Sequence, residues 1–579
     1  MNGGEIIAET LKKNGVNFIF TLCGGHISPI LVGAKKKNIK VIDVRHEPTA
    51  VFAADAIARL TGIPGVAVVT AGPGVTNSIT ALKNAQLAQS PVILLGGAAA
   101  TVLKGRGALQ DIEQLDLLKT VVKWSISIEQ NCDIVPIIEE AFKVAMSGIP
   151  GPVFIECPID ILYDEELVKE WYGRKSPTSK SFSIKKKIVN WYLKRHVDKL
   201  FACAPEEIII EENGDIVPFT IDPHNVEKVR EEIKKAQKPV LILGKQVTFR
   251  KQIVNDLSEG LKKLGIPTFL ASMSRGLLGE THPNYFRHGR SNALRNADLI
   301  IIAGMPIDFR LGYGRKINKN ATHIGINRSK EELEKNRKAD IRIQSDPGTF
   351  LLKLTEKGTF DKENWRKWFE TLQQWEERGN ARLYEFSKVE TDYINPLYLL
   401  QKIDTHKNKN SIIIGDGGDF VATASYIIKP PGPLTWLDAG PYGTLGAGAG
   451  FAIAAKLMSP NSEVILLYGD GSAAYSIAEF DTFVRHKLPI IAVIGNDAGW
   501  TQIKRDQVKY LKDPIATTLE FNDYHIVVEG YGAKGLFLEN PQKIGEALKQ
   551  AREIAQSGSP VLINAKIGIT KFREGSISM

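Results

Sequence analysis

Short apolar runs alternate, along most of this chain, with longer stretches in which apolar residues recur at helical spacing. Runs of about four to eight apolar residues bounded by glycine or polar residues are typical of buried strands, and their alternation with helices favours a parallel sheet covered by helices. Twelve such runs fall into three groups. They are NFIFTL, KVIDV, GVAVVT and PVILLGG; KPVLILGK, PTFLAS, ADLIIIAG and THIGIN; and SIIIGDG, EVILLYGDG, PIIAVIGN and SPVLINAKI.

The grouping of these runs predicts an α/β fold with three domains, each built on a doubly wound parallel sheet. The predicted domains are residues 1–165, 224–356 and 390–579. A basic, irregular insertion, residues 166–223, separates the first two, and a helical linker, residues 357–389, separates the last two. A chain of 579 residues is long enough for three cores of this size.

Within the insertion, the stretch IKKKIVNWYLKRHVDKLF has the spacing of a basic amphipathic helix. Such a helix either lies on a membrane surface, which would give a contact through residues 184–201, or packs on its own protein, and the sequence leaves both open. The apolar residues expected toward one side are Ile188, Trp191 or Tyr192, Leu193, Val197 and Leu200.

The net charge of +9 is spread along the chain without a nucleic-acid-binding motif, so neither DNA nor RNA is expected as a partner. The excess of positive charge suits an acidic ligand such as a phosphorylated cofactor or a CoA ester. The four cysteines, Cys23, Cys132, Cys157 and Cys203, form no CxxC pair, which favours either a reducing compartment or buried free thiols. Neither an apolar run of about 18 residues nor a signal peptide is found, so no transmembrane helix is expected.

The stretch LLYGDGSAAYSIAEF places Asp470 between two glycines, after an apolar run and before a helical pattern. This position is the carboxyl end of a strand, where ligands of open α/β sheets bind. The glycines permit a phosphate to approach the backbone, and Mg²⁺, which prefers oxygen ligands, would join Asp470 to it. The next apolar run ends at Asn496, so the predicted metal site consists of Asp470, the Asn496 side chain and the Ala498 carbonyl. Two ordinary turn residues after two strands are the alternative.

The spacing of GDG and asparagine resembles the diphosphate motif of thiamin-diphosphate (ThDP) enzymes. The resemblance implies ThDP and Mg²⁺ as cofactors, and it implies a catalytic glutamate in another domain, a role that VIDVRHEPTAVFAADAIARLTG gives to Glu47. TAGPGVTN resembles the loop beside the pyrimidine ring, and GPYGTLGAGAGFAIAAK offers Leu445 as the apolar wedge beneath the cofactor. The cofactor-binding residues implied are Glu47, Pro73, Asn77, Gly417, Gly418, Thr444, Leu445, Gly469, Gly471, Ser472 and Asn496.

Further stretches, FIFTLCGGHISPILV, RHEPTAVFAADAIARL, VRHKLPIIAVIGNDAGWTQI and KFREGSIS, resemble the acetolactate-synthase-like 2-hydroxyacyl-CoA lyases of eukaryotes. This resemblance implies a carbon–carbon lyase that cleaves 2-hydroxyacyl-CoA to formyl-CoA and a fatty aldehyde shorter by one carbon. It also implies fatty acid α-oxidation, a branch of lipid metabolism, at the endoplasmic reticulum membrane, and a cytoplasmic location is the alternative. A homodimer or homotetramer is expected, with ThDP between the first domain of one subunit and the third domain of another.

The same resemblance suggests residues for the substrate. Gln110 in GALQDIEQ is expected to hydrogen-bond substrate oxygens, and His26 in GGHIS to move the hydroxyl proton, although a structural histidine is an equal alternative. Arg275 and Arg290 are predicted to bind phosphates of CoA, or of ADP, in the central domain, and ordinary surface arginines are the alternative. The C-terminal TKFREGSISM is expected to fold over the site.

Two rival functions are open to the same sequence. An acetolactate-synthase-type carboligase would act on pyruvate and would usually hold FAD in the central domain, and whether FAD binds here is left open. An inactive regulatory relative would have lost Glu47, Asp470 or Asn496, and all three are present.

Overall fold

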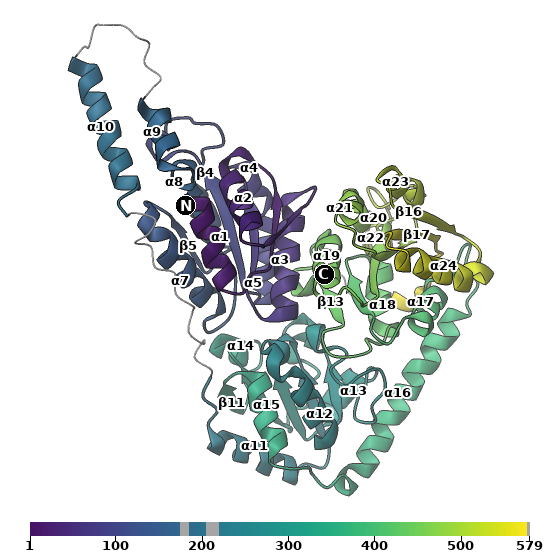
Figure 1. Cartoon of the computed structure of the whole chain (residues 1–579). Helices are drawn as coiled ribbons and strands as arrows, with labels where there is room; N and C mark the ends of the chain where they lie inside the picture. Colours follow the sequence, from purple (N-terminus) through teal and green to yellow (C-terminus); the bar gives the residue numbers. More distant parts are fainter. Residues whose placement is uncertain (174–183, 204–218, 576–579) are drawn as a thin grey trace. The chain divides into compact units, whose positions relative to one another are not determined.

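The computed structural model describes residues 1–173, 184–203 and 219–575 (Figure 1). The chain divides into two compact units, residues 1–216 and 217–579. The first unit contains one sheet and the second contains two, and every strand pair within the three sheets is parallel. The predicted fold of three α/β domains with parallel sheets is therefore confirmed.

The first unit is built on a six-stranded sheet of order β2-β1-β3-β4-β6-β5. Its strands are β1 (Phe18–Leu22), β2 (Lys40–Asp43), β3 (Gly65–Val69), β4 (Val92–Ala98), β5 (Trp124–Ser127) and β6 (Val153–Pro158). The inner strands β3, β4 and β6 are buried over their whole length, which is why they read as continuous apolar runs. The helices of this unit are α1 (Gly3–Lys13), α2 (Ser28–Lys36), α3 (Glu47–Thr61), α4 (Pro73–Asn77), α5 (Ile79–Ala88), α6 (Gln114–Leu118), α7 (Ile134–Met146), α8 (Ile159–Leu162), α9 (Glu165–Gly173) and α10 (Ile184–Leu200).

The first sheet of the second unit has five strands in the order β11-β10-β9-β7-β8. They are β7 (Pro239–Leu243), β8 (Thr268–Leu270), β9 (Leu299–Ala303), β10 (Thr322–Asn327) and β11 (Ile341–Gln344). The helices around it are α11 (Pro223–Lys235), α12 (Val254–Leu264), α13 (Arg290–Asn296), α14 (Lys330–Glu334) and α15 (Pro347–Glu356). The long helix α16 (Arg366–Ser387) then leads to the last sheet, and it lies in the segment predicted as a helical linker.

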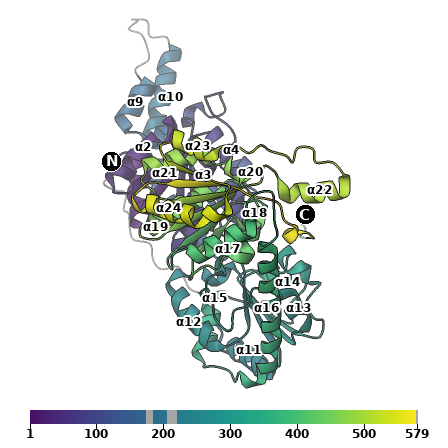
Figure 2. The ribbon, with the colours of Figure 1, turned by 90° about the vertical axis from the view of Figure 1, so that its right-hand side faces the viewer.

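The last sheet has six strands in the order β13-β12-β14-β15-β17-β16, which repeats the serial order of the first sheet. Its strands are β12 (Ile412–Gly415), β13 (Trp436–Asp438), β14 (Val464–Gly469), β15 (Ile491–Asn496), β16 (Lys534–Leu538) and β17 (Val561–Lys566). Its helices are α17 (Pro396–His406), α18 (Asp419–Ile427), α19 (Ala447–Met458), α20 (Asp470–Ala473), α21 (Phe480–Arg485), α22 (Thr501–Leu511), α23 (Tyr524–Gly530) and α24 (Ile544–Gln556). Figure 2 shows α22 standing out from the other helices around this sheet.

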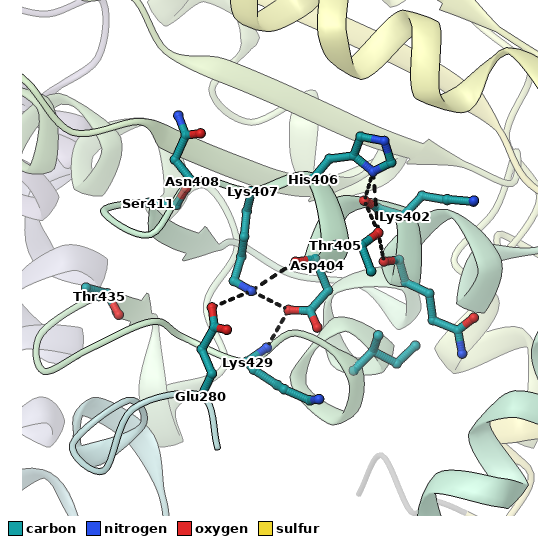
Figure 3. A network of polar contacts seen from close by, with 12 residues as sticks. Glu280, Lys402, Asp404, Thr405, His406, Lys407, Asn408, Ser411, Lys429 and Thr435 are labelled. Atoms are coloured by element: carbon teal, nitrogen blue, oxygen red, sulfur yellow. Dashed lines mark hydrogen bonds and ion pairs between the residues drawn. The ribbon is translucent and has the colours of Figure 1, made fainter. Parts of the chain in front are cut away.

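A buried lysine joins the two sheets of the second unit (Figure 3). The Lys407 side chain is 4% exposed, and its Nζ lies 2.8 Å from Glu280 Oε1 and 2.8 Å from Asp404 Oδ1. Asp404 Oδ1 also accepts a hydrogen bond from the backbone N–H of Lys429 at 2.8 Å. Glu280 follows strand β8 of the five-stranded sheet, and Asp404 lies in the last turn of α17, so this network links the two domains of the second unit.

A disulfide bond between Cys132 and Cys203, with the Cα atoms 5.5 Å apart, closes a sequence separation of 71 residues. The expectation of free thiols is therefore wrong for these two cysteines and correct for Cys23 and Cys157. The partners are far apart in sequence and form no motif, so only the fold brings them together.

The insertion contains the predicted helix, α10, but its apolar residues do not share one side. Val197 and Leu200 are 3% and 2% exposed, whereas Ile188 and Trp191 are 60% and 61% exposed. The expectation of a single apolar face is wrong because the helix carries two stripes. None of the helices among the described residues combines the length and apolar character needed to cross a bilayer.

Candidate active site

The predicted metal ligands Asp470 and Asn496 lie side by side at the carboxyl ends of the adjacent strands β14 and β15. Gly469 and Gly495 are register partners on these adjacent strands, so Asp470 and Asn496 each follow one residue later. Asp470 is 2% exposed, and its two carboxylate oxygens accept hydrogen bonds from the backbone N–H groups of Gly471, at 2.8 Å, and Gly499, at 3.0 Å. The fold therefore holds the Asp470 carboxylate in a fixed orientation at this sheet edge.

The electrostatics of this edge favour a cation. Burial raises the pKa of Asp470 to about 6, although the backbone N–H groups pull it in the other direction. The pKa of the neighbouring Asp497 is raised to about 7 by burial and by the negative charge of Asp470. A divalent ion would offset both effects, because its charge stabilises the ionised carboxylates.

The other two predicted metal ligands, the Asn496 side chain and the Ala498 carbonyl, also offer oxygen atoms. Asn496 is fully buried; its Nδ2 donates to Asn564 Oδ1 at 3.2 Å, and its Oδ1 accepts from Ala498 N–H at 3.3 Å, which leaves one lone pair of Oδ1 for a metal. Ala498 adopts a left-handed backbone conformation with φ +50°, and its carbonyl accepts one hydrogen bond from Leu519 N–H at 2.8 Å, which leaves one lone pair. A carboxylate, an amide oxygen and a carbonyl form a donor set that suits Mg²⁺ when phosphate and water complete the octahedron.

Two glycine-rich loops form a cradle beside these ligands. The N–H of Gly469 donates to the carbonyl of Gly417 at 2.9 Å, and Ser472 Oγ lies 3.1 Å from the carbonyls of Gly417 and Gly469. A Cβ at Gly417 would lie 2.3 Å from the Leu445 side chain, and one at Gly471 would lie 2.5 Å from the Trp500 ring. Gly418, with φ +101°, completes the turn. Glycine at Gly417 and Gly471 therefore lets both loops pack closely against Leu445 and Trp500. A glycine-rich turn of this kind before a helix is a form of backbone that binds phosphate groups.

Asp416 sets the position of Leu445, and the sequence interpretation gave it no role. Its carboxylate accepts hydrogen bonds from Gly446 N–H at 2.9 Å and Gly448 N–H at 2.7 Å, at the start of α19. Burial raises its pKa to about 7. Leu445 and the preceding Thr444, both half-buried, are therefore held at a capped helix start next to Gly417.

The predicted catalytic glutamate lies in the first unit, at the first residue of α3. Glu47 is 6% exposed, and its Oε2 accepts a hydrogen bond from the Nδ2 of Asn77 at 3.1 Å. Asn77 ends α4, which Pro73 begins after a left-handed Gly72 with φ +61°. The structure therefore brings Glu47 and the predicted pyrimidine-side loop together.

Three family models match this chain in succession. They describe the thiamine pyrophosphate enzyme's N-terminal TPP binding domain over residues 1–117, its central domain over residues 226–354 and its C-terminal TPP binding domain over residues 416–565. The chain belongs to the thiamine pyrophosphate enzyme family. Thiamine pyrophosphate is the same compound as ThDP. The candidate metal ligands and the two glycine-rich loops of this chain lie in the matched C-terminal domain, whereas Glu47 lies in the matched N-terminal domain.

The relatives narrow the position of the chain within the family. It is 48% identical to 2-hydroxyacyl-CoA lyase 2 of Danio rerio, over 100% of this chain and 93% of the relative, and 45% identical to 2-hydroxyacyl-CoA lyase 2 of Homo sapiens, over 100% and 92%. A probable acetolactate synthase of Mycobacterium bovis is 30% identical, over 97% of this chain and 95% of the relative. This member of the thiamine pyrophosphate enzyme family is therefore a ThDP-dependent lyase.

Gln110 and His26, the two other catalytic candidates, both lie at the carboxyl end of the sheet of the first unit. Gln110, with φ +64°, places its carbonyl 2.8 Å from where a Cβ of Gly72 would be, so it lies beside the turn that leads to Pro73. His26 Nδ1 lies 3.3 Å from Thr70 Oγ1, and burial lowers the pKa of the ring. Their roles toward a substrate stay predictions.

A buried glutamine that the sequence interpretation missed supports this end of the sheet. Gln114 is 1% exposed; its Oε1 accepts from Gly72 N–H at 2.9 Å, and its Nε2 donates to the carbonyl of Gly97 and to Glu156 Oε1. It follows Gln110 by four residues, at the end of the stretch GALQDIEQ, and its burial and hydrogen bonds identify its supporting role.

The two predicted phosphate-binding arginines have protein partners. Arg275 donates to the carbonyl of Ser425 at 2.6 Å and stacks 5.0 Å from the Trp436 ring centroid. Arg290 donates to the carbonyl of Arg310 at 2.9 Å, and burial lowers its pKa. These contacts fit a structural role at least as well as a phosphate site, and the phosphate prediction stays a prediction.

Proposed function

We propose that this enzyme cleaves the bond between C1 and C2 of a 2-hydroxyacyl-CoA, giving formyl-CoA and an aldehyde shorter by one carbon. The hydroxyl proton ends on the new formyl carbon, so the reaction balances without an oxidant. The observation that carries the proposal is the 45–48% identity, over the whole chain, to relatives named 2-hydroxyacyl-CoA lyase 2. By resemblance alone, the proposal includes a role in fatty acid α-oxidation at the endoplasmic reticulum membrane.

A cavity in the second unit supports a CoA-bearing substrate. Its volume is about 440 Å³, and it lies among the start of α13, helix α16, helix α18 and the C-terminal segment. Three arginines and three aromatic residues line it: Arg378, Arg382 and Arg573, with Trp375, Tyr426 and Phe572. Arginine pairs with phosphate through two parallel N–H donors, and aromatic faces stack on a purine, so this lining suits the 3′-phosphorylated ADP part of CoA.

Two of the three arginines of the cavity lie against neighbouring aromatic rings. The Arg382 guanidinium lies 5.5 Å and 5.7 Å from the ring centroids of Phe386 and Phe572. The Arg573 guanidinium lies 5.4 Å from the Tyr426 ring, and its Nε is 3.8 Å from Asp419 Oδ1. The described part of the C-terminal segment, up to residue 575, therefore forms a wall of the cavity, and the rest of the predicted lid lies outside the described residues.

Each remaining residue has a defined task in this proposal. Asp470, Asn496 and the Ala498 carbonyl would hold Mg²⁺ against the cofactor diphosphate, and Glu47 would hydrogen-bond the pyrimidine ring. Bound ThDP supplies an electron sink for the carbon–carbon cleavage. Gln110 would orient the substrate oxygens, and His26 would accept the hydroxyl proton, since a neutral imidazole is the form that its lowered pKa favours. A homodimer or homotetramer would place Glu47 of one subunit and Asp470 of another on the same cofactor.

The test is a product assay. The purified chain, with ThDP and Mg²⁺, is incubated with a 2-hydroxyacyl-CoA, and mass spectrometry is used to detect formyl-CoA and the shortened aldehyde. We expect both products in equal amounts from the wild type and a loss of at least about 100-fold in rate for Glu47→Gln, since positioned proton transfer contributes about 10²–10⁴-fold. Acetolactate formed from pyruvate, without products from the CoA ester, would instead establish the carboligase function of the more distant relatives.

A further inference from the structure

Helix α10 carries two apolar stripes, and its inner stripe anchors it to the first unit. Val197 and Leu200 are 3% and 2% exposed, and the half-buried Leu193 precedes them on the same side. His196 Nε2 lies 2.7 Å from Thr101 Oγ1, and the Cys132–Cys203 disulfide ties the chain just beyond the end of the helix. The C-terminal half of α10 therefore has a fixed orientation on the domain, and Figure 1 shows the helix running outward beside α9.

The outer face of α10, defined here as Ile188, Trp191, Tyr192 and Arg195, follows the i, i+3, i+4, i+7 spacing of one helix side. Ile188 is 60% exposed, Trp191 61% and Tyr192 50%. The Arg195 guanidinium lies 5.6 Å from the Trp191 ring centroid, and the exposed Lys194 and Lys199 flank the face. Isolated exposed apolar residues are ordinary, but an aliphatic residue, a tryptophan and a tyrosine adjacent on one helix face form a surface that fits a partner.

We propose that the outer face of α10 docks this enzyme on the surface of an anionic lipid bilayer. Tryptophan and tyrosine prefer the boundary between headgroups and acyl chains, where an aliphatic neighbour can enter the hydrocarbon. Arg195, Lys194 and Lys199 complement the negative charge of such a surface, and the single acidic residue of the helix, Asp198, does little to oppose them. A second copy of this chain fits less well, because the same basic residues would meet each other across a symmetric contact.

The inference rests on the geometry of α10 and not on the proposed reaction, so its failure and that of the lyase assignment are distinguishable. The experiment is flotation of the full-length, non-reduced chain with vesicles of phosphatidylcholine alone or of phosphatidylcholine with about 30% phosphatidylserine, at low and high salt. We expect several-fold more bound protein on the phosphatidylserine vesicles, and less as salt rises, because screening weakens the attraction between exposed charges and the membrane.

Matched variants identify the surface that binds. Ile188→Ser/Trp191→Ser should lose most vesicle binding, and Arg195→Glu/Lys199→Glu should lose the preference for phosphatidylserine. Tyr510→Ser/Leu511→Ser, which removes equally exposed apolar residues (64% and 74%) from α22, should bind as the wild type does. Circular dichroism should be unchanged in all of them. The proposal is overturned if the wild type does not bind vesicles, or if the α10 variants bind them as well as the wild type does. It is also overturned if light scattering shows self-association that only Ile188→Ser/Trp191→Ser removes.

Discussion

Burial raises the pKa of Asp470 to about 6, and the backbone N–H groups of Gly471 and Gly499 hold the carboxylate in one orientation. A protein tolerates a buried acid of this kind where a positive charge arrives from a ligand. At the scale of single residues, the cofactor assignment therefore depends on acids that the fold has already oriented, Asp470 in one domain and Glu47, hydrogen-bonded to Asn77, in another.

The arginines of the second-unit cavity give the prediction that belongs to this scale. Arg378→Ala/Arg382→Ala should raise the KM for a 2-hydroxyacyl-CoA by about 10-fold or more and leave kcat nearly unchanged, because phosphate binding remote from the reacting carbons contributes equally to ground and transition states. Steady-state kinetics measures both constants. Arg366→Ala, on the same helix but 68% exposed and outside the cavity lining, is the matched control. Equal KM values for the double variant and the control would remove the cavity from the CoA site.

Motif residues were predictable from sequence, and their supporting residues were not. Asp470, Asn496 and Glu47 follow strand-like runs at fixed spacings, so their positions at strand ends and helix starts could be read directly. Asp416 and Gln114 act through backbone N–H groups of residues 30 to 42 positions away, and no local pattern encodes such distances. Arg378 and Arg382 lie on an exposed helix face, where charged residues are ordinary.

At the scale of elements, strand prediction succeeded for all interior strands except one and for the edge strands β2 and β8. All twelve predicted runs contain strands, but β5, β11, β13 and β16, which lie at the edges of their sheets, were missed. Edge strands pair on one side only and face solvent, so IRIQ and KGLFL lack a continuous apolar run. The interior strand β6, VFIECP, was missed although its pattern was readable.

The disulfide that secures α10 gives the prediction for this scale. Reduction, or Cys132→Ser/Cys203→Ser, should lower the free energy of unfolding of the first unit by about 2–5 kcal/mol, because the bond closes a long loop. Hydrogen exchange followed by mass spectrometry should show faster exchange in the C-terminal half of α10. Cys157→Ser, which removes a free thiol, should leave the response to reductant intact. Identical exchange in reduced and oxidised wild type would show that the buried contacts of Val197 and Leu200 suffice.

At the scale of the whole molecule, the first and last sheets share one serial strand order, and each presents one half of the predicted cofactor site at its carboxyl edge. Membership of the thiamine pyrophosphate enzyme family accounts for this repetition, since the matched N-terminal and C-terminal domains are both TPP binding domains. The central domain connects them, and the buried Lys407 links it to the last sheet (Figure 3).

The central claim is that this chain binds ThDP through a metal held by Asp470 and Asn496. Calorimetric titration of ThDP into the purified chain, with Mg²⁺ and with the metal removed by a chelator, tests it most directly. We expect saturable binding that requires Mg²⁺ in the wild type and in Glu47→Gln, and a loss of at least about 10-fold in affinity for Asp470→Ala, given the usual cost of losing one charged ligand. Metal-independent binding that Asp470→Ala leaves unchanged would contradict the account.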